Sequence, residues 1–283
     1  MVSIIICSRS QTINDALSEN IENTVGCAYE LIVIDNYDNK YSIFEAYNLG
    51  IDRSNGEYLC FMHDDIFIHS GGWGNTIQNI FSDDSQIGLI GVAGAKIKTK
   101  MPSAWWDCDR DEKVIYVIQH HANREKEKMV FGFENGSTSE VVVVDGVFMA
   151  MRKDNRINFN TQMAGFHNYD MNISFEYKKQ GYKVIVTNQI LIEHYSTGII
   201  NEEWVKSAYK IHDIYKNNLP LKIQTSKISK RTEVANAIMF IDECFRFNNY
   251  GIAFSVWWKL FPLYTNRKYH MEFWKTILKK KQC

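Results

Sequence analysis

The stretch Gly56-Glu57-Tyr58-Leu59-Cys60-Phe61-Met62-His63-Asp64-Asp65-Ile66-Phe67-Ile68 decides the fold, because in it an apolar strand ends in a histidine and two carboxylates. Open α/β sheets bind ligands beyond the carboxyl ends of their strands. Magnesium or manganese is commonly held there by carboxylates together with substrate phosphates. The stretch therefore favours a metal and nucleotide-diphosphate site, although two acids after a strand also form turns and helix N-caps.

Strands alternate with helices on both sides of this stretch. Apolar, β-branched runs are typical of buried strands, and the segments between them have the spacing of amphipathic helices. The predicted strands are residues 3–7, 31–35, 57–62, 87–92, 140–144 and 184–186, and the predicted helical segments are 12–24, 41–53, 77–81 and 169–180. The alternation predicts an α/β protein with a mostly parallel central sheet that is flanked by helices.

The regular pattern is interrupted once and ends before the C-terminus. Residues 95–140 have the character of an irregular insertion, which carries the pair Trp105-Trp106 and a charged loop at 124–128. From Glu202 onward the pattern is helical and rich in aromatic residues. We expect one domain over residues 1–218, with halves at 1–95 and 96–218, and a helical extension over 219–283. Leu219-Pro220-Leu221 is the predicted hinge.

Composition and charge limit the class of protein. The chain has 283 residues, of which 45% are hydrophobic, enough for one large core and a smaller appendage. Residues 1–200 hold 17 Lys/Arg and 26 Asp/Glu, whereas residues 201–283 hold 15 and 7. A basic tail on an acidic body indicates an anionic partner for the tail or a solvated helical face. We expect no nucleic-acid partner.

The cysteines and the N-terminus indicate the compartment. The six cysteines contain no C-x-x-C pair, and Cys7 and Cys60 fall in predicted strands, so we expect reduced thiols. The run Val2-Ser3-Ile4-Ile5-Ile6 is too short for a signal peptide, and no apolar stretch is long enough for a membrane span. These features predict a cytoplasmic protein.

Four segments of the first half occur in an order that resembles the nucleotide-binding half of family 2 glycosyltransferases of the GT-A fold. They are Ile4-Ile5-Ile6-Cys7-Ser8-Arg9, Leu31-Ile32-Val33-Ile34-Asp35-Asn36, Glu45-Ala46-Tyr47-Asn48-Leu49-Gly50-Ile51, and Gly56-Glu57-Tyr58 through His63-Asp64-Asp65. In that family the second strand is followed by an Asp that holds uracil or ribose, and a D-x-D motif binds the metal. His63-Asp64-Asp65 resembles an H-x-D variant of this motif, found in a bacterial rhamnosyltransferase-like subgroup.

The second half resembles the same family. Val144-Asp145-Gly146-Val147-Phe148-Met149-Ala150 is similar to a V-D-G-x-x-[ML]-A element near the acceptor. Asp170 takes the position of the catalytic base, at the start of a helix that ends in Gly181-Tyr182. Glu193-His194-Tyr195-Ser196-Thr197-Gly198 is similar to a segment whose histidine completes the metal site or touches the diphosphate.

The resemblance implies an inverting, metal-dependent transfer of a sugar from a nucleotide diphosphate to a hydroxyl of a glycan or lipid-linked acceptor in surface polysaccharide synthesis. Mn²⁺ or Mg²⁺ would be the metal, and a UDP-sugar, or alternatively a dTDP-sugar, the donor. Asp170 would be the base, and Asp65 and His194 the metal ligands. Donor contacts would come from Cys7, Ser8, Arg9, Asp35, Asn36, Asn48, His63 and Asp64, and acceptor contacts from Asp145, Gly146, Trp105 and Trp106.

Some positions depart from the family pattern. Tyr169 and Asn172 stand where acids are usual around the base, and Asn36 replaces a second Asp. A catalytically degenerate homologue that binds nucleotide or carbohydrate therefore stays an alternative. A nucleotidyltransferase is a lesser one, because such enzymes need a glycine-rich phosphate loop after the first strand and Cys7-Ser8-Arg9-Ser10 has no glycine. The pair His120-His121 has no partner at ligand spacing, so we expect surface histidines.

The tail combines aromatic residues with cations. Its segment 252–261 contains Trp257-Trp258, and further along come Arg267, Lys268, Trp274 and Lys279-Lys280-Lys281. This composition is typical of a peripheral membrane contact, here at the inner face of the cytoplasmic membrane. Packing on the catalytic domain and a homodimer through residues 221–283 are the alternatives.

Overall fold

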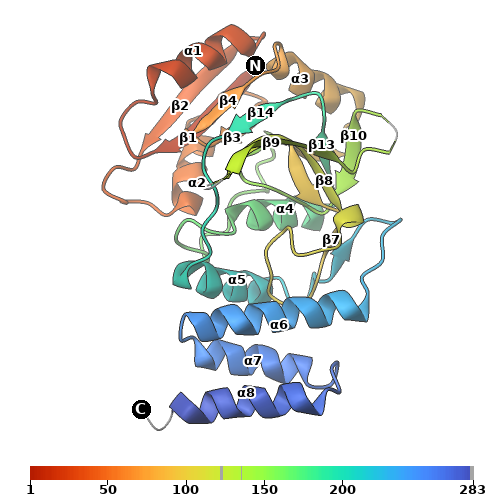
Figure 1. Cartoon of the computed structure of the whole chain (residues 1–283). Coiled ribbons are helices and arrows are strands. Elements are labelled where there is room, and N and C mark those ends of the chain that lie inside the picture. Colours follow the sequence, from red (N-terminus) through yellow and green to blue (C-terminus); the bar gives the residue numbers. More distant parts are fainter. Residues whose placement is uncertain (122–123, 135, 281–283) are drawn as a thin grey trace.

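The computed structural model describes residues 1–121, 124–134 and 136–280, and the side chains of all of these except Arg124 and Lys280. Lys281, part of the basic stretch of the predicted tail, lies outside the described residues. Figure 1 shows an α/β body and, below it, a column of helices that ends at the C-terminus. The predicted α/β class is confirmed.

The central sheet has seven strands in the order β10-β13-β5-β12-β3-β1-β2 (Figure 1). The pairs β1/β2, β1/β3 and β5/β13 are parallel, whereas β12 is antiparallel to both of its neighbours and β10 is antiparallel to β13. The sheet is therefore mixed, and less parallel than we expected. Its strands are β1 Val2–Ser8, β2 Tyr29–Asp35, β3 Tyr58–Met62, β5 Ile87–Gly91, β10 Thr138–Val141, β12 Phe148–Arg152 and β13 Lys183–Thr187.

A second sheet has six strands. Five of them follow the order β11-β6-β8-β14-β4, and the sixth, β9, pairs with β8. Its strands are β4 Ile66–Ile68, β6 Ala93–Ala95, β8 Lys113–His121, β9 Arg124–Phe131, β11 Val143–Val144 and β14 Ile192–His194. A short pair, β7 Ile97–Lys98 and β15 Leu221–Lys222, lies beside it, and a 3₁₀ helix, η1, spans Arg110–Glu112.

The prediction of an irregular insertion at residues 95–140 is wrong. Much of this segment is the antiparallel hairpin of β8 and β9, and the expected charged loop at 124–128 lies within β9. The charged residues from 125 to 128 are exposed, while Met129 and Phe131 pack against the core. A hairpin strand with so much solvent exposure lacks the clear alternation that identifies strands from sequence.

Local sequence explains where the helices of the body begin. Ser42 and Glu45 form a capping box at the start of α2, and Asn14 caps α1 through its side chain. Helix α2 packs on β1 and β2, α3 on β5, and α4 on β5, β11 and β13. The helices are α1 Asp15–Thr24, α2 Ile43–Arg53, α3 Trp73–Asp83, α4 Tyr169–Lys179, α5 Glu202–Ile214, α6 Lys230–Arg246, α7 Tyr250–Leu260 and α8 Arg267–Lys280.

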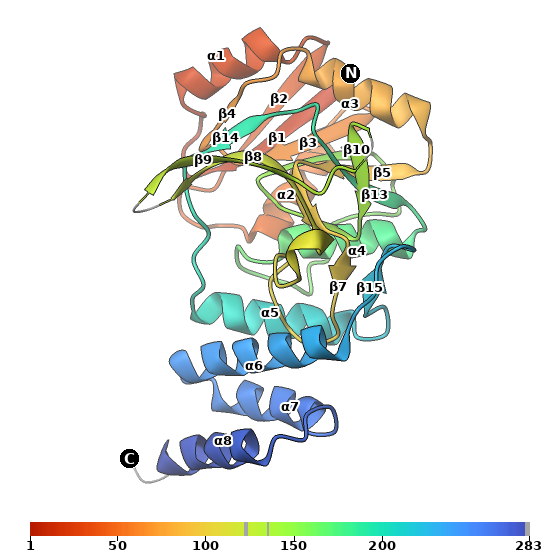
Figure 2. The ribbon, with the colours of Figure 1, turned by 45° about the vertical axis from the view of Figure 1, so that its right-hand side comes forward.

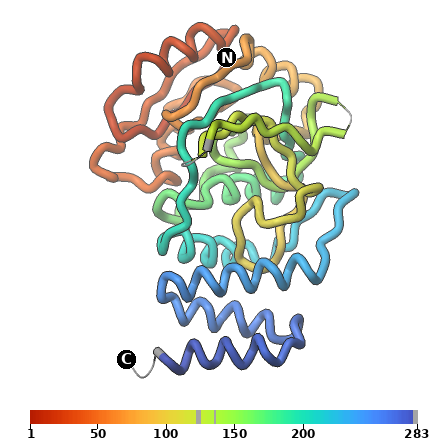
Figure 3. The backbone as a smooth tube through the Cα atoms, viewed as in Figure 1, coloured from red at the N-terminus to blue at the C-terminus, as the bar shows by residue number. Residues whose placement is uncertain are grey.

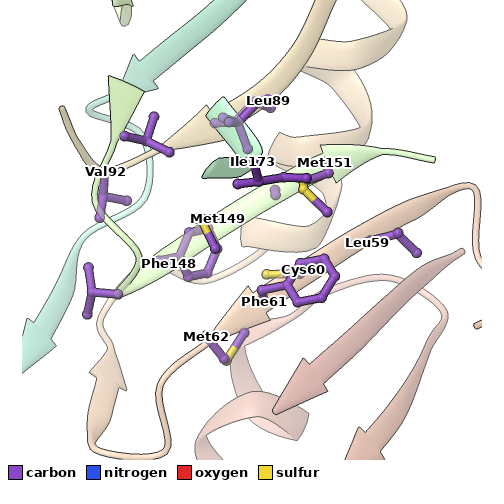
Figure 4. Close-up of a cluster of buried hydrophobic side chains, with 14 of the residues drawn as sticks. Leu59, Cys60, Phe61, Met62, Leu89, Val92, Phe148, Met149, Met151 and Ile173 are labelled. Atoms are coloured by element: carbon purple, nitrogen blue, oxygen red, sulfur yellow. The ribbon is translucent and has the colours of Figure 1, made fainter. Parts of the chain in front are cut away.

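The main core lies between the central sheet and its helices. Figure 4 shows Phe61 and Met62 of β3 near Phe148 and Met149 of β12, with Ile173 of α4 close by. These side chains are fully buried. Since β3 ends in this core, the polar residues that follow it are held at a rigid edge of the sheet.

Helices α5 to α8 lie one beyond another, away from the sheets (Figures 2 and 3). A second core joins them, and α5 contributes to both cores. Ile211, with Tyr215 directly after the helix, packs in the main core, and Trp204 and Val205 pack in the second. The packing therefore links the body to the tail through α5. Within the described residues, none of the helices combines the length and the apolar character that a membrane span needs.

Candidate active site

Three candidate ligands meet at the edge where β3 ends. Asp65 Oδ1 lies 3.6 Å from His63 Nδ1 and 3.6 Å from His194 Nε2. One ligand atom from each residue lies within 4.8 Å of the others. The structure thus brings Asp65 and His194, both predicted as metal ligands, together with His63, which we predicted as a donor contact.

Strand pairing explains why residues so far apart in the chain meet. His63 follows β3, and its backbone N–H donates to the carbonyl of Val147 (3.2 Å). Strands β4 and β14 are antiparallel with Ile66 opposite His194, and the N–H of Tyr195 donates to the carbonyl of Asp65 (3.1 Å). The second sheet therefore fixes the distance between the H-x-D segment and His194.

Two further side chains orient the histidines. His63 Nε2 lies 2.6 Å from the hydroxyl of Tyr169, and His194 Nδ1 lies 3.1 Å from Gln119 Oε1. The amide nitrogen of Gln119 donates to the carbonyls of Ser196 (2.7 Å) and His120 (2.8 Å), so its oxygen can only accept from His194. The proton of His194 then sits on Nδ1, and the Nε2 lone pair faces Asp65. Such outer hydrogen bonds commonly set the tautomer of a metal-binding histidine.

The charges in the cluster shift its pKa values. Burial opposes ionisation of His63, but the hydrogen bond to Asp65 and the charges of Asp65, Asp145 and Asp64 outweigh it and raise the pKa of His63. Burial and then the neighbouring His63 lower the pKa of His194. Burial would raise the pKa of Asp65, but hydrogen bonds from His63 and Ser196 and the histidine charges hold it well below its usual range. An ionised carboxylate beside a neutral imidazole is a donor set that fits a divalent cation.

Cys7, Ser8 and Arg9, at the end of β1, differ in their contacts and exposure. Ser8 Oγ donates to Asp64 Oδ2 (3.0 Å), which ties the end of β1 to the H-x-D segment. Burial raises the pKa of the Cys7 thiol to about 11, so this predicted donor contact stays neutral. Arg9 is exposed directly after β1.

A cavity of about 730 Å³ lies beyond the carboxyl ends of β1 and β2. Asp35 lines it, is exposed, and accepts a hydrogen bond from the N–H of Tyr37 (3.1 Å). The remaining lining residues are Ser10, Gln11, Val33, Ile34, Tyr37, Asp38, Lys40, Tyr41, Leu49 and Arg53. This cavity has the position that the resemblance implies for a nucleoside.

Two predicted donor contacts brace loops in the structure. The amide of Asn36 pairs with both backbone groups of Tyr41 (2.9 Å each), and the amide of Asn48 pairs with both backbone groups of Phe159 (2.8 and 2.9 Å). Each amide therefore binds a neighbouring loop through both its nitrogen and its oxygen, and these asparagines shape the site.

A second cavity, of about 520 Å³, opens beside His194. Asp145, Trp105 and Trp106, which we predicted as acceptor contacts, line it, and β8 and β9 form one wall. Trp105 Nε1 donates to Asp145 Oδ2 (2.8 Å), so the carboxylate positions the buried indole, while Trp106 is 38% exposed. Gly146 lies outside this lining: a Cβ there would meet the Tyr169 hydroxyl at 2.4 Å.

Asp170 lies in the first turn of α4 and is only partly exposed. Burial and the charge of Asp145 raise its pKa to about 7. Its Oδ1 accepts from the N–H of Met171 (2.7 Å). A carboxyl group whose pKa lies near neutrality is suited to general-base work.

The departures from the family pattern have structural explanations. Asn172 is fully buried; it accepts from the N–H of Asn160 (2.9 Å) and donates to the Tyr215 hydroxyl (2.7 Å), so it holds α4 in place. Tyr169 orients His63 instead of supplying a charge. Neither replacement removes a group from the cluster of His63, Asp65 and His194.

Sequence reasoning missed Gln119 and Tyr169 as orienting residues, and it missed the carboxylate partner of the part-exposed His120. His120 lies in β8 next to its last residue, and its Nε2 lies 2.6 Å from the buried carboxylate of Glu193. This carboxylate also contacts His69 Nε2 (2.8 Å) and Lys126 Nζ (3.0 Å). Only the alternation of residues 113–121, read as a strand, could have indicated which of them face the site.

At one edge of the central sheet an acid and two histidines therefore form a candidate ligand-binding site, with two cavities nearby. A model of a glycosyltransferase-like family matches residues 3–219, and the chain belongs to this family. It is a glycosyltransferase of the GT-A fold, as the sequence motifs predicted. No curated protein matches the chain.

Solved structures resemble the chain at low sequence identity. The crystal structure of GalNAc-T7 with UDP, GalNAc and Mn²⁺ has a TM-score of 0.51 and 9% identity, and the match covers 76% of this chain and 48% of the GalNAc-T7 chain. The crystal structure of S. aureus TarS 1–349 has a TM-score of 0.47 and 12% identity, and the match covers 87% of this chain and 72% of the TarS chain. The crystal structure of A197 from STIV has a TM-score of 0.41 and 12% identity, and the match covers 69% of this chain and 86% of the A197 chain. The GalNAc-T7 likeness supports the fold.

Proposed function

We propose that the chain transfers a sugar from a nucleotide diphosphate to an acceptor hydroxyl, with inversion and with the help of a divalent cation. The observation that carries the proposal is the meeting of Asp65, His63 and His194 between a cavity beside Asp35 and a cavity lined by Trp105. A cation held by these three residues would neutralise charge on the departing diphosphate. Two imidazoles in the donor set favour Mn²⁺ over Mg²⁺, whose ligands are oxygens.

Asp170 is the proposed base. Its pKa of about 7 leaves it largely ionised at slightly alkaline pH, when it can accept the proton of the attacking hydroxyl. Direct attack by the acceptor inverts the anomeric centre and needs no covalent nucleophile. Trp105, held by Asp145, offers an apolar face on which the acceptor sugar can pack.

For the donor we propose a UDP-sugar, with a dTDP-sugar as the alternative carrier. Asp35 stands at the mouth of the nucleoside cavity, where a carboxylate can accept from uracil or ribose. The UDP and Mn²⁺ in the GalNAc-T7 structure agree with this assignment. A glycan or lipid-linked acceptor, surface polysaccharide synthesis and a cytoplasmic location in a bacterium follow from the motif resemblance and belong to the same proposal, as do the domain limits 1–218 and 219–283.

Calorimetric titration of UDP, dTDP, GDP and CMP, each with and without Mn²⁺, tests the proposal on the wild type and on Asp65→Ala. We expect one nucleotide to bind in a Mn²⁺-dependent way and the dependence to vanish in the variant. Asp111→Ala, at an exposed acid of η1, is the matched control and should bind as the wild type does. Nucleotide binding that ignores both the metal and Asp65 would contradict the metal-dependent mechanism.

A further inference from the structure

The last two helices carry an exposed apolar face that the catalytic chemistry does not use. Trp258 is 66% exposed, Phe261 51%, Met271 57% and Leu278 55%. On α8, Met271, Trp274 and Leu278 recur at helical spacing and so share one side of the helix. Exposed clusters of large apolar side chains mark interaction surfaces.

These side chains form one continuous feature. An open groove of about 570 Å³ runs between α7 and α8, lined by Trp257, Phe261, Arg267, His270, Met271, Trp274, Lys275 and Leu278. Its floor is rigid: Trp257 stacks on Phe273 with ring centroids 4.9 Å apart, and Trp257 Nε1 donates to His270 Nδ1 (3.1 Å). We call this groove with the adjoining Trp258 and Phe254 the terminal apolar face.

The two helices that carry the terminal apolar face have an excess of positive charge. Residues 250–280 contain six Lys/Arg and a single acid, Glu272. Arg267 and Lys275 line the groove itself. Helix α8 lies at the end of the helical column farthest from the catalytic sheets, so nothing in the body covers it (Figures 1 and 2).

We propose that the terminal apolar face docks on an anionic phospholipid surface. Tryptophan and long apolar side chains favour the boundary between headgroups and acyl chains, and lysine and arginine beside them reach the headgroup charges. A second copy is a poorer fit. A two-fold contact through the same face would set Arg267 and Lys275 of one copy close to the same cations of the other.

Sedimentation of the full chain with vesicles tests this proposal without donor, acceptor or metal, so its failure leaves the proposed function untouched. Vesicles of phosphatidylcholine alone are compared with vesicles of equimolar phosphatidylcholine and phosphatidylglycerol. We expect binding to the anionic vesicles and little to the neutral ones. Raising the salt to about 1 M, where the Debye length falls to about 3 Å, should release much of the bound protein.

Two sets of variants separate the apolar and the ionic contributions. Trp258→Gln with Met271→Gln should weaken binding to anionic vesicles at least about tenfold, since each substitution removes most of an apolar side chain that the lipid surface would bury. Lys275→Gln with Lys279→Gln should weaken it by a similar factor, at about fivefold per charge. Ile199→Gln, an exposed apolar position outside the face, is the control and should bind as the wild type.

Three results would overturn the proposal. They are no binding by the wild type, equal binding to neutral and anionic vesicles, and a concentration-dependent dimer that Trp258→Gln with Met271→Gln abolishes. The last result, seen by analytical ultracentrifugation, would assign the face to a second copy. All of the substituted residues are exposed, and circular dichroism melting should confirm that each variant folds.

Discussion

The side-chain oxygen of Gln119 lies 3.1 Å from Nδ1 of His194. Gln119 comes from β8 and His194 from β14, and the two strands are parallel neighbours with Gln119 directly beside His194 in register. One hydrogen bond between strands therefore decides which imidazole nitrogen faces Asp65.

Gln119→Leu tests this relationship. Without the acceptor, His194 can place its proton on Nε2 and lose the lone pair that faces Asp65, so we expect Mn²⁺ affinity to fall about 10–100-fold. Titration calorimetry with Mn²⁺ measures the change. Gln162→Leu, at an exposed loop position, is the control. Unchanged affinity in Gln119→Leu would remove His194 from the metal site.

Asp170→Asn should abolish most turnover while leaving the site assembled. We expect turnover to fall about 10²–10⁴-fold, because the amide cannot accept the proton of the acceptor hydroxyl. Nucleotide binding with Mn²⁺ should persist, because Asp170 is not among the three grouped ligands. Loss of nucleotide binding together with turnover would instead assign Asp170 a structural role.

The pH dependence follows from the same carboxyl group. Burial and Asp145 raise the pKa of Asp170 to about 7, so turnover should fall as the pH drops below about 7. The folded state also binds this proton more tightly than the unfolded state, where the ordinary value is 3.8. The resulting stabilisation is complete below 3.8 and is lost as the pH rises through about 7. Asp170→Asn should therefore gain stability relative to the wild type at alkaline pH, in metal-free melting experiments.

Trp105→Phe separates the indole N–H from the aromatic ring. The variant keeps an apolar face but leaves Asp145 Oδ2 without its donor, so the acceptor KM should rise several-fold while the donor KM stays unchanged. Trp106→Phe is the matched control, since Trp106 is more exposed and lines the same cavity. Equal effects of the two substitutions would show that the bond to Asp145 does not position the acceptor.

Asn236 of α6 holds the loop that carries the tryptophan pair. Its buried amide donates to Thr99 Oγ1 (2.8 Å), Ser103 Oγ (3.3 Å) and the carbonyl of Asp107 (3.0 Å). Asn236→Ala should destabilise the fold by about 1–3 kcal/mol and raise the acceptor KM, because buried polar partners are left unpaired. Chemical denaturation and initial rates measure the two effects. Met239→Ala, exposed on the same helix, should change neither.

Gly50→Ala tests the contact between α2 and β1. A Cβ at Gly50 would lie 2.4 Å from Cγ2 of the fully buried Ile5. The overpacking costs about 1–3 kcal/mol and exceeds the helix-propensity gain of about 0.5–1 kcal/mol, so stability should fall. Gly251 lies in α7 with open space around it, so Gly251→Ala should show only the stability gain from the higher helix propensity of alanine. A rise in melting temperature for Gly50→Ala would show that α2 can shift on the sheet.

The sequence by itself determined the fold class and the residues that end the strands. Apolar runs such as 58–62 and the capping box of Ser42 and Glu45 are local patterns, and local patterns set secondary structure. The ordered motifs then predicted the family, which the match over residues 3–219 confirms. The same motifs predict Asp65 and His194 as ligands of one metal site.

Only the tertiary structure decided how those residues act. The hairpin of β8 and β9, whose exposed charges conceal its strand pattern in the sequence, forms a wall of the proposed acceptor cavity and supplies Gln119. Register between distant strands sets Ile66 opposite His194, and loop packing pairs the amides of Asn36 and Asn48 with the backbone of Tyr41 and Phe159. These relationships depend on hydrogen bonds between segments far apart in the chain, and a local pattern contains no information about which distant partner a polar group will find.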